Sequence, residues 1–182
     1  MSRRAVGVRR AMPSRLVAEE IPLGRMRKIA LRILRGNLLC SMATVTPRGR
    51  AHINTAYFCY SDDLELFFLS DPRSRHCRNL STNRSMAVAI FSSSQSWEGA
   101  DRGLQLFGTC GPARGKNAAR ARRLYARRFP AFAKWRARLE PGDPGNAYRF
   151  YRFDARELKI LDEAELGDAV FVTATLNKKR RA

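Results

Sequence analysis

The chain has 182 residues, of which 45% are hydrophobic, so it can form one domain with a sizeable buried core and is not globally disordered. No apolar run is long enough to cross a membrane. The Arg-rich N-terminus also lacks the continuous apolar stretch of a secretory signal. We therefore expect a cytoplasmic protein without membrane insertion.

The formal net charge of +19 is concentrated in three segments. Residues 1–36 hold ten Lys and Arg against two acidic residues, residues 112–139 hold ten against none, and residues 178–181 add four. Such segments can bind nucleic acid or anionic membrane non-specifically, but these lack interleaved aromatic residues and any recognisable nucleic-acid-binding motif. We expect solvated basic surface and no specific nucleic-acid partner. A nucleic-acid or membrane-surface protein that works through its basic ends is a competing hypothesis.

The cysteine and histidine pattern argues against a metal centre. The four cysteines form no CxxC pair and the chain has two histidines. Three of the cysteines fall in apolar segments, which predicts buried, reduced thiols rather than a disulfide framework.

The spacing of apolar residues predicts a mainly β domain over residues 23–176, between a mobile basic arm (1–22) and a basic tail (177–182). An amphipathic helix over 23–35 precedes a hairpin around the Pro47–Arg50 turn, and most later segments are β-rich. Because the strands come in hairpins, we predict a small antiparallel barrel of about six strands. Strands are expected near 38–46, 51–60, 64–70, 86–91, 103–110, 147–161 and 169–176, and helices near 72–82 and 115–139, the latter broken before Pro130.

Residues 67–91 carry the strongest functional signal. The apolar run that ends at Leu69 is followed by Ser70-Asp71-Pro72, which predicts a strand end and a helix start with Asp71 as N-cap and Pro72 at the first helical position. The first turns then carry three arginines and His76. Cations at a helix N-terminus oppose the macrodipole, so this pattern favours a bound anion held by backbone N–H groups, hydroxyls and an Arg fork. The alternative is a solvated basic turn without a ligand.

The order ATVTPRGRAHINTAYF, LELFFLSDPRSRHCRNLSTN, VAIF and GLQLFGTC resembles the pyridoxamine 5′-phosphate oxidase-like family of FMN-binding split β-barrels. The resemblance covers about residues 27–165, and its most specific part is Ser70 followed by Ser74-Arg75-His76. It implies a six-stranded antiparallel split β-barrel that forms a homodimer, with one flavin in each of two clefts between the subunits.

The resemblance also implies a set of cofactor-binding residues. Ser70, Ser74, Arg75 and His76 would hold the ribityl phosphate. Asn54 and Thr55, with the backbone of Ile53, match the strand that lies against the isoalloxazine ring, and Gln105 matches a glutamine near the polar edge of the ring. The protein would supply shape, a phosphate clamp and hydrogen bonds at the ring edge, while the cofactor carries the chemistry.

Three departures limit what the resemblance implies. His76 stands where the family usually has Lys, and its charge is pH-sensitive near neutrality. The strand lacks the basic residues that true pyridoxamine-phosphate oxidases place around the ring, and NKKRRA replaces their C-terminal segment. We therefore expect a flavin-dependent oxidoreductase acting on an unidentified small molecule rather than that oxidase itself. A deazaflavin reductase using the same groove and a non-catalytic flavin- or haem-binding protein are the alternatives.

Four further residues have two interpretations each. His52 is either a hairpin-side residue or a flavin contact, and Trp97 either covers the cleft or packs on a dimer partner. Arg149 and Arg152 alternate with phenylalanines on a late strand, which favours outward-facing charge over a contact with the partner's flavin. No Ser-His-Asp set or paired carboxylates emerge, so no dedicated side-chain acid is indicated.

Overall fold

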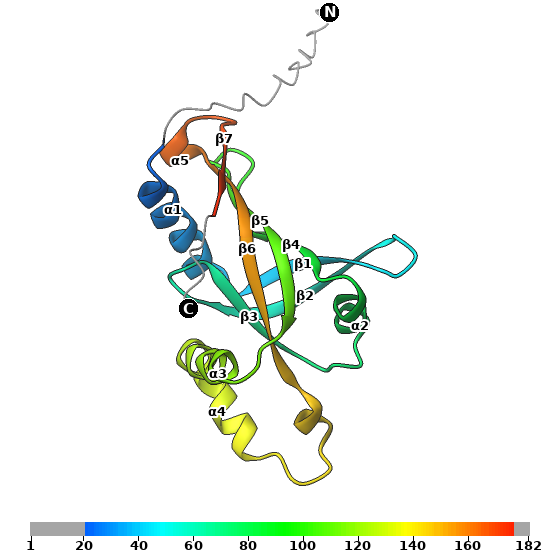
Figure 1. The fold of residues 1–182 in the computed structure, drawn as a ribbon. Helices are drawn as coiled ribbons and strands as arrows, with labels where there is room; N and C mark the ends of the chain where they lie inside the picture. Colours follow the sequence, from blue (N-terminus) through cyan, green and yellow to red (C-terminus); the bar gives the residue numbers. More distant parts are fainter. Residues whose placement is uncertain (1–20, 177–182) are drawn as a thin grey trace, which may run out of the picture.

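The strands form one antiparallel sheet that closes into a barrel (Figure 1). This computed structural model describes residues 21–176; residues 1–20 and 177–182, where most of the expected arm and all of the tail fall, lie outside the described part. The strand order is β3-β2-β1-β4-β5-β6-β7, and β3 also pairs with β6. That pairing closes six strands, which confirms the predicted split barrel, and β7 extends the sheet outside it. The strands are β1 (Leu39–Val45), β2 (Ala51–Tyr60), β3 (Glu65–Ser70), β4 (Ser85–Phe91), β5 (Arg102–Pro112), β6 (Arg149–Asp162) and β7 (Phe171–Thr175).

The helices lie on the outside of the barrel (Figure 1). The predicted helical stretch after β5 is divided at Pro130, as expected from the missing backbone N–H of proline. Within the described residues, no helix is long and apolar enough to span a bilayer. The helices are α1 (Leu23–Gly36), α2 (Arg75–Thr82), α3 (Lys116–Arg128), α4 (Pro130–Ala137), the 3-10 turn η1 (Pro144–Ala147) and α5 (Glu163–Leu166).

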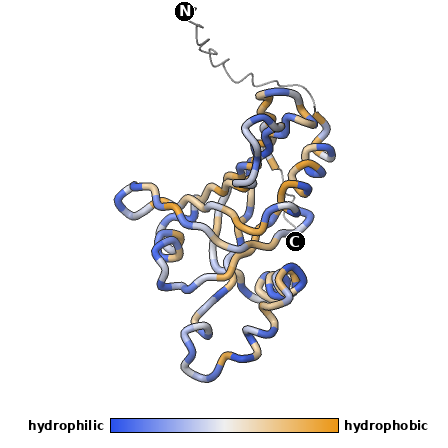
Figure 2. The backbone as a smooth tube through the Cα atoms, turned by 180° about the vertical axis from the view of Figure 1, so that it is seen from behind, coloured by the Kyte–Doolittle hydropathy of each residue, from blue (hydrophilic) through white to orange (hydrophobic). Residues whose placement is uncertain are grey.

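The alternation of buried and more exposed side chains along the strands produces the main core. In β1 and β4 every second side chain is buried, and these residues form one core cluster with the apolar face of α1. Figure 2 shows the apolar positions along the strands and the hydrophilic tip of the β1–β2 hairpin. Ile21 also packs against this core, and the Pro22 carbonyl accepts the first helical N–H bonds of α1, so the packed chain begins before Leu23.

A buried carboxylate holds α3 against the barrel. Glu65, on β3, is 5% exposed and forms ion pairs with Arg152 of β6 and Arg120 of α3. A second apolar cluster, which includes Phe67, Phe150 and Tyr125, lies between α3, α4 and the same strands. A buried charge with two cationic partners is costly to break, because removing the partners leaves it uncompensated. The position of α3 is thus set by both packing and charge.

The barrel is open on one side, between β2 and β3. Their pairing runs from Tyr60↔Leu66 to Phe58↔Phe68 and stops there. Beyond that point β3 remains paired with β6 as far as Ser70↔Arg149, while β2 continues alongside β1. Residues 54–57 of β2 therefore have no strand partner on this side in the described structure. This divergence is the split of the barrel.

Gly108 is required by a close approach of two strands. The register between β5 and β6 shifts at Phe107/Gly108, and a Cβ at position 108 would clash with the Asp154 carbonyl oxygen and lie 3.0 Å from Ala155 Cα. Backbone atoms of a central strand cannot move away cheaply.

We expect Gly108→Ala to lower the free energy of unfolding by about 1–3 kcal/mol, measured by urea denaturation. The matched control is Gly103→Ala on the same strand, because its new Cβ meets only ordinary contacts, the nearest being Phe91 Cβ at 3.8 Å. Equal stability of the two variants would contradict this account of the strand crossing.

Candidate functional site

Two hydroxyls and an imidazole meet where β3 gives way to α2. Ser70 is the last residue of β3, Ser74 is the N-cap of α2, and His76 lies in the first turn of that helix. His76 Nε2 lies 2.7 Å from Ser70 Oγ and 3.1 Å from Ser74 Oγ, and the two hydroxyl oxygens are 3.3 Å apart. These are three of the four predicted phosphate-binding residues, and the structure brings them together without Arg75.

The expected helix start is wrong by three residues. α2 begins at Arg75, with the Ser74 hydroxyl accepting a hydrogen bond from the Cys77 N–H. Asp71 does not cap the helix, because its carboxylate accepts from the backbone N–H and the guanidinium of Arg73. The Asp71 side chain thereby closes a turn of its own, which Pro72 fits equally well.

This cluster lies in the wall of a pocket of about 590 Å³, which is in the size range of small-molecule sites. The pocket occupies the split of the barrel, because Asn54 and Thr55 line it from β2 while Leu69 and Ser70 line it from β3. Aromatic side chains from β2, α3, the junction of α3 with α4, α4 and the segment before β6 complete the lining. They are Tyr57, Tyr125, Phe129, Phe132, Trp135 and Tyr148.

The aromatic wall was not predicted as part of the site. The sequence indicates only an apolar side of the helical stretch, made of Leu124, Phe129, Phe132 and Trp135. In the structure Tyr125 packs against Phe129 and Phe132, with ring centroids 4.7 and 5.0 Å apart. Burial raises the pKa of Tyr125 to about 12, so its hydroxyl stays protonated near neutral pH.

Two polar groups in the pocket wall favour particular ligand atoms. Asn54 Oδ1 is buried and has no hydrogen-bond partner in the described structure. A buried acceptor without a donor is costly, so a ligand N–H at this point would be stabilising. Burial, and then the nearby charge of His52, hold the pKa of His76 below its usual value, so the imidazole is neutral at pH 7.

The other predicted cofactor residues lie outside this cluster. Arg75 is exposed on the first turn of α2, and Ile53 is 69% exposed on the outer face of β2. Gln105 lines a different pocket, on β5. It belongs to the same outward row as Thr55, through the pairs Thr55↔Ser41, Ser41↔Ala89 and Ala89↔Gln105. Three strand spacings place it about 14 Å from Thr55.

The structure also places the four residues for which the sequence allows two interpretations each. Arg152 forms an ion pair with buried Glu65, so it has a structural partner, whereas Arg149 is exposed near the pocket. Trp97 is fully exposed in the loop between β4 and β5. His52 is half-buried and acts on His76 through its charge. All four cysteines are free and buried, including the three for which apolar segments predict burial.

Comparisons with known proteins agree with this architecture. The family model for pyridoxamine 5′-phosphate oxidase matches residues 26–161. A search of curated proteins finds no match.

Solved structures with the same fold include a haem-binding protein from Mycobacterium smegmatis (18% identity, TM-score 0.63, covering 82% of this chain and 55% of that chain). They also include the haem storage protein HutZ from Vibrio cholerae (16% identity, TM-score 0.58, 73% and 92%). A putative pyridoxamine 5′-phosphate oxidase from Listeria innocua is a third (14% identity, TM-score 0.58, 75% and 98%). At these identities the structures establish the shared fold alone. The family match spans most of the chain and coincides with the barrel, and the chain belongs to the pyridoxamine 5′-phosphate oxidase family.

Proposed function

We propose that the protein is an FMN-binding oxidoreductase that acts on a small-molecule substrate. The observation that carries the proposal is the Ser70–Ser74–His76 cluster at one end of an aromatic-walled pocket in the barrel split. FMN has a matching shape, since a phosphate and a planar ring are joined by a flexible chain. When bound, FMN would supply hydride or single-electron transfer, and the protein would supply position and environment.

The phosphate end of the proposed site combines neutral and charged donors. Ser70 and Ser74 offer hydroxyls, and the first backbone N–H groups of α2 have no helical acceptor of their own. Arg75 is exposed beside them and carries a guanidinium fork suited to a phosphate. In the described structure no carboxylate lies within 4 Å of the Arg75 guanidinium, so this cation does not have to break an ion pair to bind an anion.

The ring end of the site is suited to an aromatic group with an N–H on its edge. The unpartnered Asn54 Oδ1 can accept that hydrogen bond, and the unpaired backbone of residues 54–57 of β2 lies in the same wall. Tyr125, Phe129 and Trp135 form an aromatic wall on one side of the pocket. These residues fit a flavin, and a deazaflavin shares its tricyclic shape.

The haem alternative is less well supported by this pocket. A haem iron usually takes an imidazole or thiolate ligand. In the described residues, His76 is the one imidazole that lines the pocket, and its Nε2 already lies within hydrogen-bond distance of two hydroxyls. The four thiols are buried away from it, and burial raises the pKa of Cys40 and Cys59 to about 12. A visible absorption spectrum of the loaded protein distinguishes flavin, deazaflavin and haem.

We further propose that the outer face of β2, β1, β4 and β5 packs against the same face of a second copy. The outward positions on these four strands carry no Lys, Arg, Asp or Glu, although 28% of the chain is charged. Apolar side chains are exposed there, including Ile53, Tyr57 and Phe91. Uncharged apolar surface of this kind marks an interface, and most homo-oligomers are two-fold symmetric.

Such a dimer would explain the position of Gln105. A two-fold axis along the strands, between β1 and β4, exchanges the β2 side of one subunit with the β5 side of the other. The row that joins Thr55 to Gln105 would then place Gln105 of the partner subunit opposite Thr55. In this arrangement each pocket takes its phosphate donors from one subunit and its glutamine from the other.

We expect Arg75→Ala to weaken FMN binding by about 30- to 150-fold, because it removes two charge-assisted hydrogen bonds to the phosphate. Riboflavin, which lacks the phosphate, should bind the wild type poorly and lose little from the substitution. Isothermal titration of both ligands measures the effect. Arg78→Ala, another exposed arginine on α2, is the control and should leave both affinities unchanged. Equal losses for FMN and riboflavin would place the phosphate elsewhere.

The His76 imidazole predicts a pH dependence of FMN binding. In the free protein its pKa lies below 6.5, and a bound phosphate dianion favours the imidazolium form. FMN affinity should therefore gain from His76 as the pH falls below about 6.5. The phosphate itself titrates near pH 6, so the quantity to measure is the ratio of wild-type to His76→Gln affinity at each pH. A ratio that stays constant between pH 8 and 5.5 would contradict a direct contact.

Light scattering should give a particle of twice the 20.7 kDa chain mass at micromolar concentration. Ala43→Arg places a charge at the centre of the uncharged face, so we expect monomers and a large loss of FMN affinity. Ala133→Arg on the exposed surface of α4 is the control and should remain dimeric. A monomeric Ala43→Arg variant with wild-type FMN affinity would refute the contribution of the partner subunit's Gln105.

A further inference from the structure

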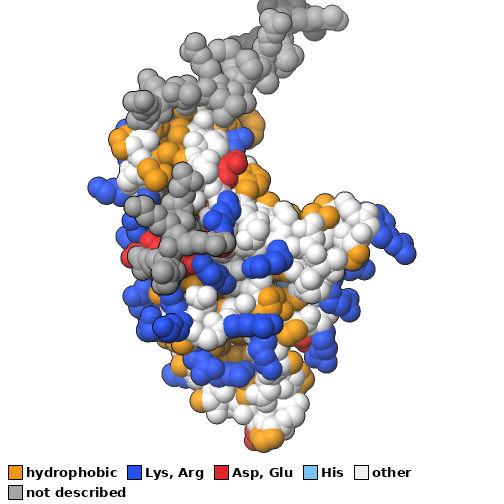
Figure 3. All heavy atoms as spheres, viewed as in Figure 1, with side chains coloured by type: hydrophobic (Ala, Val, Ile, Leu, Met, Phe, Trp, Pro, Cys, Tyr) orange, Lys and Arg blue, Asp and Glu red, His pale blue; other side chains and the backbone are white. Residues whose placement is uncertain are grey.

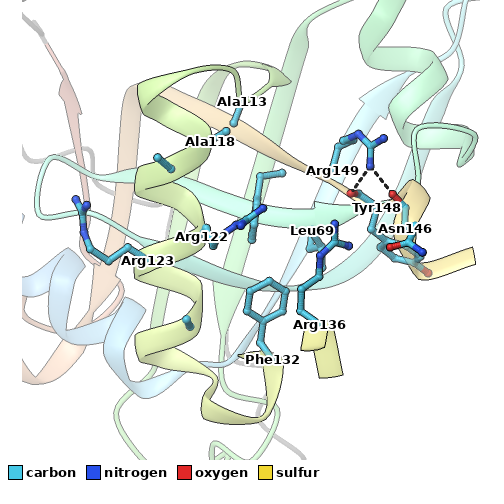
Figure 4. A pocket seen from close by; sticks show the side chains of 13 residues that line it. Leu69, Ala113, Ala118, Arg122, Arg123, Phe132, Arg136, Asn146, Tyr148 and Arg149 are labelled. Atoms are coloured by element: carbon cyan, nitrogen blue, oxygen red, sulfur yellow. Dashed lines mark hydrogen bonds between the residues drawn. The ribbon is translucent and has the colours of Figure 1, made fainter. Parts of the chain in front are cut away.

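A second pocket, of about 730 Å³, lies on the other side of Phe132 and Tyr148 from the candidate cofactor pocket. It is bounded by α3, α4 and the ends of β3 and β6 (Figure 4). Its floor is apolar, with Leu69, Phe132 and Phe150, and its rim carries four arginines. Among residues 21–176, no acidic residue lines it.

The arginines of this rim differ from their neighbours in the chain. Arg120 pairs with Glu65, and Arg128 donates to backbone carbonyls and lies over aromatic rings. By contrast, none of the four rim arginines (Arg122, Arg123, Arg136, Arg149) forms an ion pair within the described residues. Figure 3 shows Lys and Arg side chains gathered over the region of α3 and α4. Like charges that gather without a counter-charge favour binding of an anion.

Two of the rim arginines are held in place by the backbone. Arg136 donates to the Gly145 carbonyl at 3.1 Å, and Arg149 donates to the Asn146 and Tyr148 carbonyls at 2.6 and 2.9 Å. Figure 4 shows Arg122 extending from α3 into the space between the helices and the sheet, whereas Arg123 points away from the other three. Guanidinium groups that are already oriented lose less side-chain entropy when an anion binds.

We propose that this pocket, which Arg122, Arg136 and Arg149 border, binds a small molecule with an apolar body and a phosphate or carboxylate group. The apolar floor would contact the apolar body of the ligand, and the guanidinium groups would bind its phosphate or carboxylate group. The volume lies within the range of small-molecule sites, and a concave pocket suits a compact ligand better than an extended polyanion. The proposal does not depend on FMN binding, because no residue of the Ser70–Ser74–His76 cluster lines this pocket.

The test is calorimetric titration of the full chain, without cofactor, with 1-naphthyl phosphate. We expect binding that is at least tenfold tighter than that of 1-naphthol or inorganic phosphate, each of which supplies half of the required chemistry. Arg122→Gln should weaken 1-naphthyl phosphate binding about tenfold by removing a charged hydrogen-bond donor. The matched control is Arg127→Gln, an exposed arginine of the same helix outside the pocket, which should leave the affinity unchanged.

A second variant distinguishes binding inside the pocket from attraction to its positive charge. Ala118 lines the pocket from α3, so Ala118→Phe should reduce binding by filling the space while the net charge stays the same. Equal weakening by Arg122→Gln and Arg127→Gln would show non-specific attraction to a basic surface and overturn the proposal. Unchanged affinity in Ala118→Phe, or displacement of the probe by equimolar FMN, would place the probe elsewhere and also overturn it.

Discussion

The pairing of β3 on two sides is the constraint on which the site depends. β3 closes the barrel by pairing with β6 along its whole length, but its pairing with β2 stops at Phe58↔Phe68. Because the closing strand stays with β6, it separates from β2 and opens a gap without breaking the barrel. Ser70, the last residue of β3, therefore lies in one wall of the gap. The chain then turns into α2, with Ser74 as its N-cap and His76 in its first turn.

The positions of two buried acidic residues explain how a chain of net charge +19 packs the Arg-rich helix α3 against its core. Glu65 and Asp162 are buried, and each pairs with two arginines that join different elements: Glu65 joins α3 to β6, and Asp162 joins α1 to β5. Arg122, Arg123 and Arg127 of α3 can then point outward or toward the second pocket. As a result α3 and α4 border two cavities of different character, one with hydroxyls and an imidazole and one with guanidinium groups.

Local patterns predicted most of the fold and part of the site. Alternation and turn residues identified the strands, and the Ser70-to-His76 spacing predicted a cluster that the structure assembles. The same local rules misplaced the start of α2, because Asp71 has a nearer competitor in Arg73. They could not find the aromatic wall or the second pocket, since both arise where α3 and α4 meet β3 and β6. Nor could they separate Gln105 from Thr55, whose distance depends on strand order.

We propose that the hydroxyl–imidazole cluster binds the phosphate of the cofactor, and NMR of the histidine side chains tests this binding most directly. The chain has two histidines, so ¹⁵N-histidine labelling gives few signals, and His52→Gln assigns them. We predict that FMN shifts the His76 ring nitrogens toward their protonated values at pH 6, whereas riboflavin does not. Identical shifts with both ligands, or none with FMN, would contradict the account.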